Sequence, residues 1–123
     1  ALPLVEICPK NKFFDFTAKY QKGMSDYIVP AQIDPDQVRD IQEMSQKVFN
    51  LVGCRDMARS DFILDEKGKA YFLEVNTIPG FTATSLLPMA AQQQHISFTD
   101  LCLTIAGFAA KRKNAASCSE KVI

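Results

Sequence analysis

Histidine, tryptophan and cysteine are scarce in this sequence of 123 residues. It has one histidine, no tryptophan and four cysteines, and no two cysteines have the C-x-x-C spacing typical of zinc sites. We therefore expect reduced cysteines, with Cys54 and Cys102 as small residues of the core. The single histidine, His95, is predicted to lie in a loop, and no catalytic partner is evident for it.

Net charge and long apolar runs are also lacking. Lysine and arginine number 14, and so do aspartate and glutamate, so no overall field attracts nucleic acid or an anionic membrane. No apolar run approaches the length of a bilayer span, and residues 1–7 lack the basic start of a secretory signal. We expect a cytoplasmic protein without nucleic-acid or membrane partners. The five glycines are scattered, so this sequence contains no glycine-rich phosphate loop.

The remaining composition is ordinary for a globular domain, with 47% hydrophobic and 23% charged residues. The length allows one domain. We predict a folded lobe over residues 1–113 and a polar tail over residues 114–123.

The first half of the sequence predicts two short strands and one helix. Apolar runs indicate strands at residues 2–7 and 26–30. A helix should begin after Asp34, which with Gln37 forms a capping box, and should end at Gly53. Its apolar positions have helical spacing and are expected to pack on a sheet: Val38, Ile41, Met44, Val48, Leu51 and Val52.

The last third of the sequence predicts two helices. One begins at Thr84 or Ser85 and runs through about Gln94. The other begins after Ser97 and closes with the basic residues 111–113, which complement the helix dipole better than they suggest a nucleic-acid patch. Its apolar face is expected to contain Phe98, Leu101, Cys102, Ile105, Phe108 and Ala109.

Between these parts, residues 58–64 and 70–75 are two runs rich in apolar residues, and they flank the turn-forming residues 65–68. This pattern predicts a β-hairpin with Lys67 and Gly68 at its tip. The register then places three pairs opposite one another: Arg59 with Asn76, Asp61 with Glu74, and Ile63 with Phe72. The opposite face is expected to be buried and to contain Phe62, Leu64, Tyr71, Leu73 and Val75.

The predicted pairing brings four polar side chains to one face at one end of the hairpin: Arg59, Asp61, Glu74 and Asn76. Two opposed carboxylates repel each other, and Arg59 offsets part of this repulsion. A hard cation offsets more, because Mg²⁺ prefers carboxylate and amide oxygens. A solvated polar face with one ordinary ion pair is the alternative interpretation.

A Pro-Gly turn ending at Gly80 follows directly, and it should bring backbone amides beside the carboxylates. The helix that starts at Thr84 or Ser85 offers further amides and partial positive charge to an anion. The alternative is that Thr84 or Ser85 serves as a plain helix cap.

Several segments together resemble the C-terminal part of the D-alanine–D-alanine ligases of the ATP-grasp superfamily. They are Arg59-Ser60-Asp61, Glu74-Val75-Asn76-Thr77-Ile78-Pro79-Gly80-Phe81-Thr82 and Ser85-Leu86-Leu87-Pro88-Met89-Ala90, with the upstream segments 13–16, 19–20 and 27–31. The resemblance covers roughly residues 2–110. Phe14 and Phe16 depart from it, because tyrosines are common at those positions.

The resemblance implies an α+β fold, an ATP-grasp C-terminal subdomain with a mainly antiparallel sheet flanked by helices. It implies a larger parent enzyme that joins two D-alanines for peptidoglycan synthesis. In that reaction ATP phosphorylates the carboxylate of the first D-alanine, and the amine of the second attacks the acylphosphate. Because the other lobes carry the glycine-rich loop and the adenine site, we expect this chain to be inactive alone.

The same resemblance implies roles in phosphoryl transfer for five residues. Asp61, Glu74 and Asn76 would bind two Mg²⁺ ions, or Mn²⁺, beside ATP. Arg59 would stabilise the acylphosphate, and Lys19 would contact the γ-phosphate.

Further implied roles concern the second D-alanine. The Gly80 amide would complete an oxyanion hole, since glycine lets the backbone approach closely. Ser85 and the Leu86 amide would hold the substrate carboxylate, and Tyr20 would line the pocket.

Two other interpretations stay open. The parent could join D-alanine to D-lactate or D-serine, although Lys19 and Tyr20 favour an amino acid as nucleophile. The chain could also be a non-catalytic folding or interaction unit. Without the remaining lobes of the ligase, apolar surface should be exposed, which predicts self-association such as a homodimer.

Overall fold

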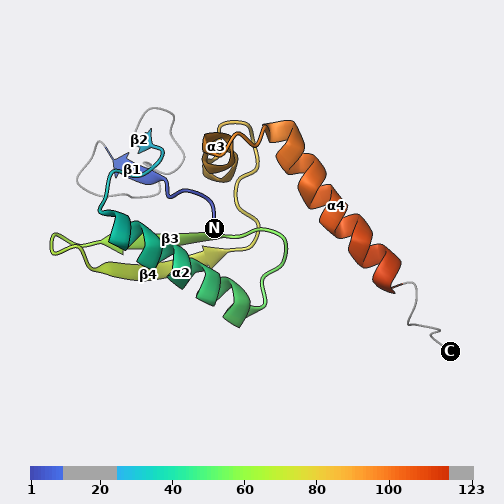
Figure 1. Cartoon of the computed structure of the whole chain (residues 1–123), viewed down its shortest axis with the longest axis horizontal. Coiled ribbons are helices and arrows are strands. Elements are labelled where there is room, and N and C mark those ends of the chain that lie inside the picture. Colours follow the sequence, from blue (N-terminus) through green and yellow to red (C-terminus); the bar gives the residue numbers. More distant parts are fainter. Residues whose placement is uncertain (10–24, 117–123) are drawn as a thin grey trace.

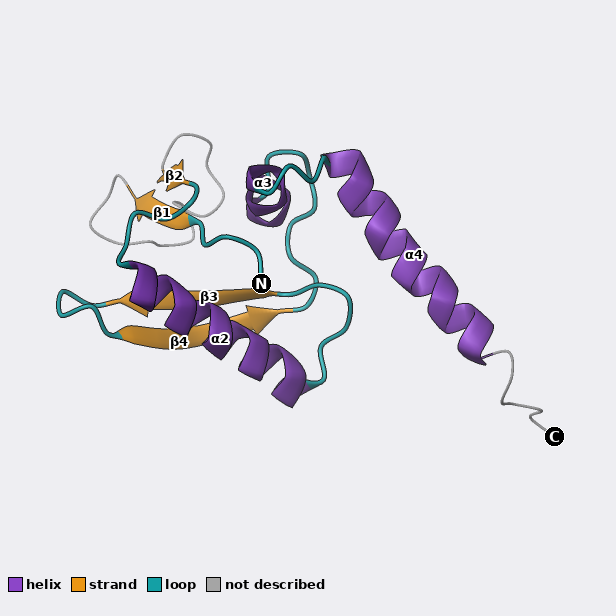
Figure 2. Ribbon diagram, in the orientation of Figure 1, coloured by secondary structure: helices purple, strands orange, loops and turns teal. Residues whose placement is uncertain are grey.

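The computed structural model describes residues 1–9 and 25–116, and the predicted α+β class is confirmed. The elements follow in the order β1 (Glu6–Pro9), β2 (Ser25–Ile28), α2 (Pro35–Val52), β3 (Arg59–Leu64), β4 (Ala70–Asn76), α3 (Leu86–Gln93) and α4 (Phe98–Ala116) (Figure 1). The strands form two antiparallel pairs, β1 with β2 and β3 with β4. Helix α2 lies across the β3–β4 hairpin, and α3 and α4 lie to one side of it (Figure 2). None of the described helices is long and apolar enough to cross a membrane.

The first strand begins later than the sequence predicts, at Glu6 rather than residue 2. The segment before it bonds to other parts of the chain instead of to a strand. The Leu4 carbonyl accepts a hydrogen bond from the Ala31 amide at 2.9 Å, and the Leu2 carbonyl accepts one from Gln42 Nε2 at 2.9 Å. These carbonyls are therefore satisfied by α2 and the loop before it, without a sheet ladder.

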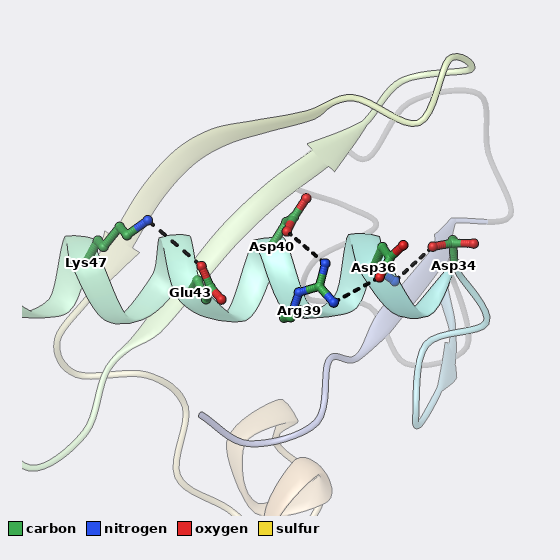
Figure 3. Close-up of polar contacts among 6 residues, drawn as sticks. All are labelled: Asp34, Asp36, Arg39, Asp40, Glu43 and Lys47. Carbon is green, nitrogen blue, oxygen red and sulfur yellow. Dashed lines mark hydrogen bonds and ion pairs between the residues drawn. The ribbon is translucent and has the colours of Figure 1, made fainter.

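Helix α2 has the predicted ends. Asp34 Oδ1 accepts from the Asp36 amide at 2.8 Å, and the Asp34 amide donates to Gln37 Oε1 at 3.2 Å, which completes the capping box. Gly53 ends the helix with a left-handed φ of 72°. Along the exposed side, Arg39 pairs with Asp36 and Asp40, and Lys47 pairs with Glu43 (Figure 3). These are contacts within the helix, so the sequence alone specifies them.

Only part of the predicted apolar face of α2 is covered. Ile41 is 5% exposed, whereas Leu51 is 88% exposed and Val52 is also exposed. The prediction is wrong for this last turn. Figure 1 shows the reason: α2 crosses the hairpin obliquely, and its C-terminal end lies past β4.

Helices α3 and α4 pack against each other and supply most of the buried apolar residues. Ala90, Ala91 and Leu101 are buried there, and the Phe98 ring lies 5.5 Å from the Phe81 ring. The predicted cap of α4 is confirmed, because Ser97 Oγ accepts from the Asp100 amide at 3.1 Å.

Beyond that packed end, α4 departs from the prediction. The helix continues to Ala116, past the predicted end at residue 113, and Phe98, Phe108 and Ala109 of the predicted apolar face are exposed. Periodicity marks which side of a helix can be buried, but not whether another element lies against it.

Candidate functional site

The end of the hairpin that carries the predicted polar cluster has the predicted register. Arg59 lies opposite Asn76, and Asp61 lies opposite Glu74. Strand pairing alone therefore places two carboxylates side by side on one face, beside an arginine and an asparagine.

The rest of the register differs from the prediction. Ile63 lies opposite Tyr71, not Phe72, and Phe72 lies opposite Phe62 with the two ring centroids 5.6 Å apart. The loop runs from Asp65 to Lys69, which shifts the pairing by one residue, and a bulge at Leu73 shifts it back. The two irregularities cancel, which is why the prediction was right at the polar end.

The bulge also changes which side chains are covered. Tyr71 is 44% exposed and Leu73 is 55% exposed, although the predicted register assigned both to the buried face. An inserted residue reverses the alternation of side chains beyond it. The prediction of burial is therefore wrong for these two residues.

Arg59 and Asp61 form a bidentate ion pair. Arg59 Nε lies 2.7 Å from Asp61 Oδ1, and Nη2 lies 2.9 Å from Oδ2. Paired contacts of this kind combine two charge-assisted hydrogen bonds with a fixed planar geometry. The guanidinium thus offsets the repulsion expected between Asp61 and Glu74.

Asn76 shapes the turn that follows the hairpin. Its Oδ1 accepts from the Ile78 amide at 2.9 Å, the hydrogen bond of an Asx turn. The chain then passes through Pro79, which is buried, to Gly80. A Cβ atom at Gly80 would lie 3.1 Å from Ser85 Oγ, so glycine permits this close approach. The structure therefore brings together Gly80 and Ser85, two of the predicted site residues.

Ser85 is the residue before α3, but its side chain does not cap the helix. Ser85 Oγ accepts from the Thr82 amide at 3.1 Å and lies 2.8 Å from Thr82 Oγ1. The plain helix-cap interpretation is therefore wrong. Sequence reasoning missed Thr82 as the residue that holds Ser85; a hydroxyl residue three positions before Ser85 was the available signal. Leu86 is the first residue of α3, so its amide belongs to the helix N-terminus.

The donor set on the hairpin fits a hard cation. Each carboxylate oxygen has a second lone pair beside the one that Arg59 uses, and Glu74 stands opposite. The described part of the chain contains no group of three His, Cys, Asp or Glu side chains that could hold a metal ion. A cation on the hairpin would therefore need an amide oxygen such as that of Asn76, or oxygens from a substrate.

Comparison with known proteins decides the family. The model of the D-Ala D-Ala ligase C-terminus matches residues 1–106. The chain belongs to the D-alanine–D-alanine ligase family. It is 52% identical over 101 residues to the D-alanine–D-alanine ligase of Carboxydothermus hydrogenoformans, covering 81% of this chain and 32% of that protein. The corresponding enzyme of Pelotomaculum thermopropionicum is 50% identical over 101 residues, with 82% and 32% covered.

A solved structure agrees with the family assignment. The D-alanine–D-alanine ligase from Bacillus anthracis complexed with ATP superposes with a TM-score of 0.75 at 27% identity, covering 94% of this chain and 37% of that one. The present chain thus spans about a third of the length of the ligases it matches.

Two of the site residues expected from the ligase resemblance, Lys19 and Tyr20, lie outside the described residues, as do Gly23 and the segment 13–16. Their roles stay predictions. The seven others lie on the hairpin, on the turn after it and at the start of α3: Arg59, Asp61, Glu74, Asn76, Gly80, Ser85 and Leu86.

Other features of the described residues lie away from the site. An open hollow of about 550 Å³ lies at the opposite end of the hairpin, lined by Asp65, Glu66, Lys67, Lys69 and Tyr71. Cys8, Cys54 and Cys102 are free thiols, half-buried rather than in the core. Desolvation, and next the Glu6 carboxylate, raise the pKa of the Cys8 thiol. Cys8 is therefore poorly suited to act as a thiolate nucleophile at neutral pH.

Proposed function

We propose that this chain is the C-terminal lobe of a D-alanine–D-alanine ligase and that it carries the metal, oxyanion and second-substrate parts of the active site. One observation carries the proposal: the Arg59–Asp61 pair and the opposed Glu74 occupy the end of the hairpin that leads through Asn76 to Gly80 and Ser85. Charge-neutralising groups and carboxylate-binding groups thus follow one another over a short stretch of chain.

The reaction requires stabilisation of a transferring phosphoryl group and of an oxyanion. Asp61, Glu74 and Asn76 would hold Mg²⁺ or Mn²⁺, which when bound neutralises charge on the phosphates. Arg59 contacts Asp61 through Nε and Nη2, and a guanidinium has five N–H donors, enough for one side chain to serve both a carboxylate and acylphosphate oxygens. Asp61 thereby holds Arg59 in one orientation before the substrate arrives.

The second D-alanine would be held by its carboxylate. Ser85 Oγ is oriented by Thr82 and lies at the N-terminus of α3, where the helix dipole favours an anion. The Gly80 amide would donate to the oxyanion that forms when the amine attacks. Lys19 and Tyr20 retain their predicted contacts with the γ-phosphate and the second substrate.

The identity of the product would distinguish a D-alanine–D-alanine ligase from relatives that use D-lactate or D-serine as the second substrate. The ligases matched here are named for D-alanine on both sides, which supports the dipeptide. Comparing product formation with D-alanine, D-lactate and D-serine in the ligase restored with its upstream lobes tests this choice. Preferential formation of D-alanyl-D-lactate or D-alanyl-D-serine would overturn it. The reaction consumes ATP, and the cytoplasm stays the predicted compartment.

Calorimetry of ATP with Mg²⁺ tests whether this lobe is a partial site. We expect negligible binding by this chain and clear binding by the version restored with its upstream lobes. Tight, Mg²⁺-dependent binding by the short chain would show that the hairpin forms a more autonomous site. In the restored enzyme, Glu74→Gln should abolish ligation, and near-normal turnover would overturn the metal assignment.

A role as a folding or interaction unit has one supporting observation. Apolar side chains are widely exposed on the described surface: Leu51, Val52, Ile63, Leu73, Ile78 and Leu103. Surface of this kind is normally covered by another lobe or another chain. Sedimentation of the chain at increasing concentration should show self-association. A monomer throughout would rule out the homodimer.

A further inference from the structure

Helix α4 is held at both of its ends. At its start, the Phe98 ring lies against Phe81, and Leu101 is buried beside α3. Near its other end, the guanidinium of Arg112 forms an ion pair with the Asp56 carboxylate in the loop between α2 and β3. Figure 1 shows α4 running along the side of the molecule on which this loop lies. Arg112 therefore has a role beyond complementing the helix dipole.

The ion pair differs from those on α2. The pairs of Arg39 and Lys47 join neighbouring turns of one helix and hold no second element (Figure 3). Arg112 and Asp56 are 56 positions apart, so their contact fixes the relative placement of two elements. Arg112 also lies outside residues 1–106, which match the family model. The contact is thus a feature of this chain that the family match does not account for.

Asp56 is held in an unusual conformation for this contact. Its φ is 64°, in the left-handed region that favours glycine, although aspartate tolerates it better than most residues. Its side chain is 21% exposed, and the carboxylate has the Arg112 guanidinium as its ion-pair partner. If the turn alone mattered, glycine would suit the position better.

The loop leads directly into the candidate site. Met57 and Ala58 are the two residues between Asp56 and Arg59, and the Met57 amide donates to the Arg55 carbonyl at 2.7 Å in a tight turn. Arg59 is the first residue of β3, so the position of the turn sets where β3 begins. Because only two residues separate them, a displacement of Asp56 would also displace Arg59.

We infer that Asp56 and Arg112 form a positioning contact, in which α4 holds the loop before β3 and thereby fixes Arg59 against Asp61. Neither residue touches the reacting groups. The structural part of this inference is independent of the proposed ligase function, and its effect on turnover rests on that function.

Amide hydrogen exchange of Arg59 and Asp61 in this chain tests the structural part. Arg112→Gln and Asp56→Gly should each speed exchange about twofold to fivefold, the range that partly exposed ion pairs produce. Arg112→Lys keeps the charge and should restore most of the protection. Arg112→Gln is the sharper variant, because it leaves the backbone of the loop unchanged, whereas Asp56→Gly removes the carboxylate and also frees the backbone.

Arg39→Gln is the matched control, since it breaks an exposed pair on α2 that joins no other element. It should leave exchange at Arg59 and Asp61 unchanged. If Arg112→Gln and Asp56→Gly also leave it unchanged, the positioning contact is refuted.

Kinetics of the ligase restored with its upstream lobes test the second part. Arg112→Gln should lower kcat about twofold to fivefold, the same range as the change in exchange. The KM for D-alanine should be unchanged, because Ser85 is not disturbed. An unchanged kcat would refute the catalytic effect. If the unmodified restored protein has no ligase activity while the exchange results hold, the proposed function fails and the contact stands.

Discussion

Two aspartates, Asp61 and Asp65, stand near opposite ends of the same hairpin, and the structure uses them differently. Asp65 Oδ1 accepts from the amides of Lys67 and Lys69 at 3.0 and 2.8 Å, and Oδ2 lies 3.4 Å from the Tyr71 hydroxyl. Asp61 instead binds the two nitrogens of a single guanidinium. Asp65 is surrounded by donors of its own loop, whereas Asp61 is held along one edge and can accept further ligands.

This comparison separates a carboxylate that closes a loop from one that can still accept a ligand. The Asp65 bonds close the loop, and they come from residues within a few positions in the sequence. The Asp61 contact pairs a carboxylate that would otherwise repel Glu74 with the Arg59 guanidinium, and it leaves the carboxylate able to bind a cation. Both residues are aspartates on a hairpin, so only the pattern of partners distinguishes them.

The largest effect should come from Asp61→Asn in the restored ligase. If Asp61 binds the cation as proposed, its loss should lower kcat about 100-fold or more, because the cation supplies several kcal/mol of charge stabilisation. Steady-state kinetics measure this loss. Asp65→Asn is the control and should leave kcat within about twofold, since its carboxylate serves the loop. Equal losses in both variants would break the distinction between the two aspartates.

The next effect concerns the loop that Asp65 closes. Gly68 has a φ of 81°, and an added Cβ would lie 2.2 Å from Gln37 Nε2, which donates to the Gly68 carbonyl at 3.0 Å. Gly68→Ala should lower the free energy of unfolding of this chain by about 1–2 kcal/mol. Urea unfolding followed by circular dichroism measures it.

Gly107→Ala is the control for that variant. Gly107 lies inside α4, and an added Cβ meets no atom within 4 Å. This change should raise the free energy of unfolding by about 0.5–1 kcal/mol, because alanine has the higher helix propensity. A stabilising Gly68→Ala would contradict the loop geometry.

A smaller effect is expected from Asp65→Ala. It removes the acceptor for the Lys67 and Lys69 amides, which water can partly replace at this exposed site. The free energy of unfolding should fall by about 1 kcal/mol. Asp65→Asn keeps an acceptor oxygen and should recover most of the loss in the same urea experiment. If asparagine is as costly as alanine, charge rather than hydrogen bonding closes the loop.

The smallest expected effect concerns the bulge at Leu73, which lies between the polar end and the loop end of the hairpin. Leu73→Ala should change the free energy of unfolding by less than about 0.5 kcal/mol, because the side chain is exposed in this chain. Ile41→Ala is the control and should cost about 2–5 kcal/mol, as expected for a buried aliphatic residue. A cost at Leu73 close to that at Ile41 would show that the regular, unbulged register is the correct one.

Features governed by neighbouring residues were predictable from the sequence. Asp34, Gln37 and Gly53 set the ends of α2 through hydrogen bonds and a φ value that depend on a few adjacent positions. The two strands of the hairpin were recognisable from apolar runs around a turn. The polar end of the hairpin was found as well, although it depended on two irregularities that compensate each other.

Features that depend on distant contacts were not predictable. Leu51 is exposed because the hairpin does not extend beneath the last turn of α2. Arg112 contacts Asp56, which lies 56 positions earlier in the chain. The Leu73 bulge has no marker in the sequence, since neither glycine nor proline occurs there.

Short-range interactions along the chain specify which segments become helices and strands, and an ordered set of short motifs identifies the family. The reason is that capping, turn formation and periodicity act within a few residues. Three contacts could not be read from the sequence: the bidentate pair of Asp61 with Arg59, the contact of Thr82 with Ser85 beside Gly80, and the ion pair that joins α4 to the loop before β3. Those contacts depend on how strands register and helices cross, which is settled by packing over the whole fold.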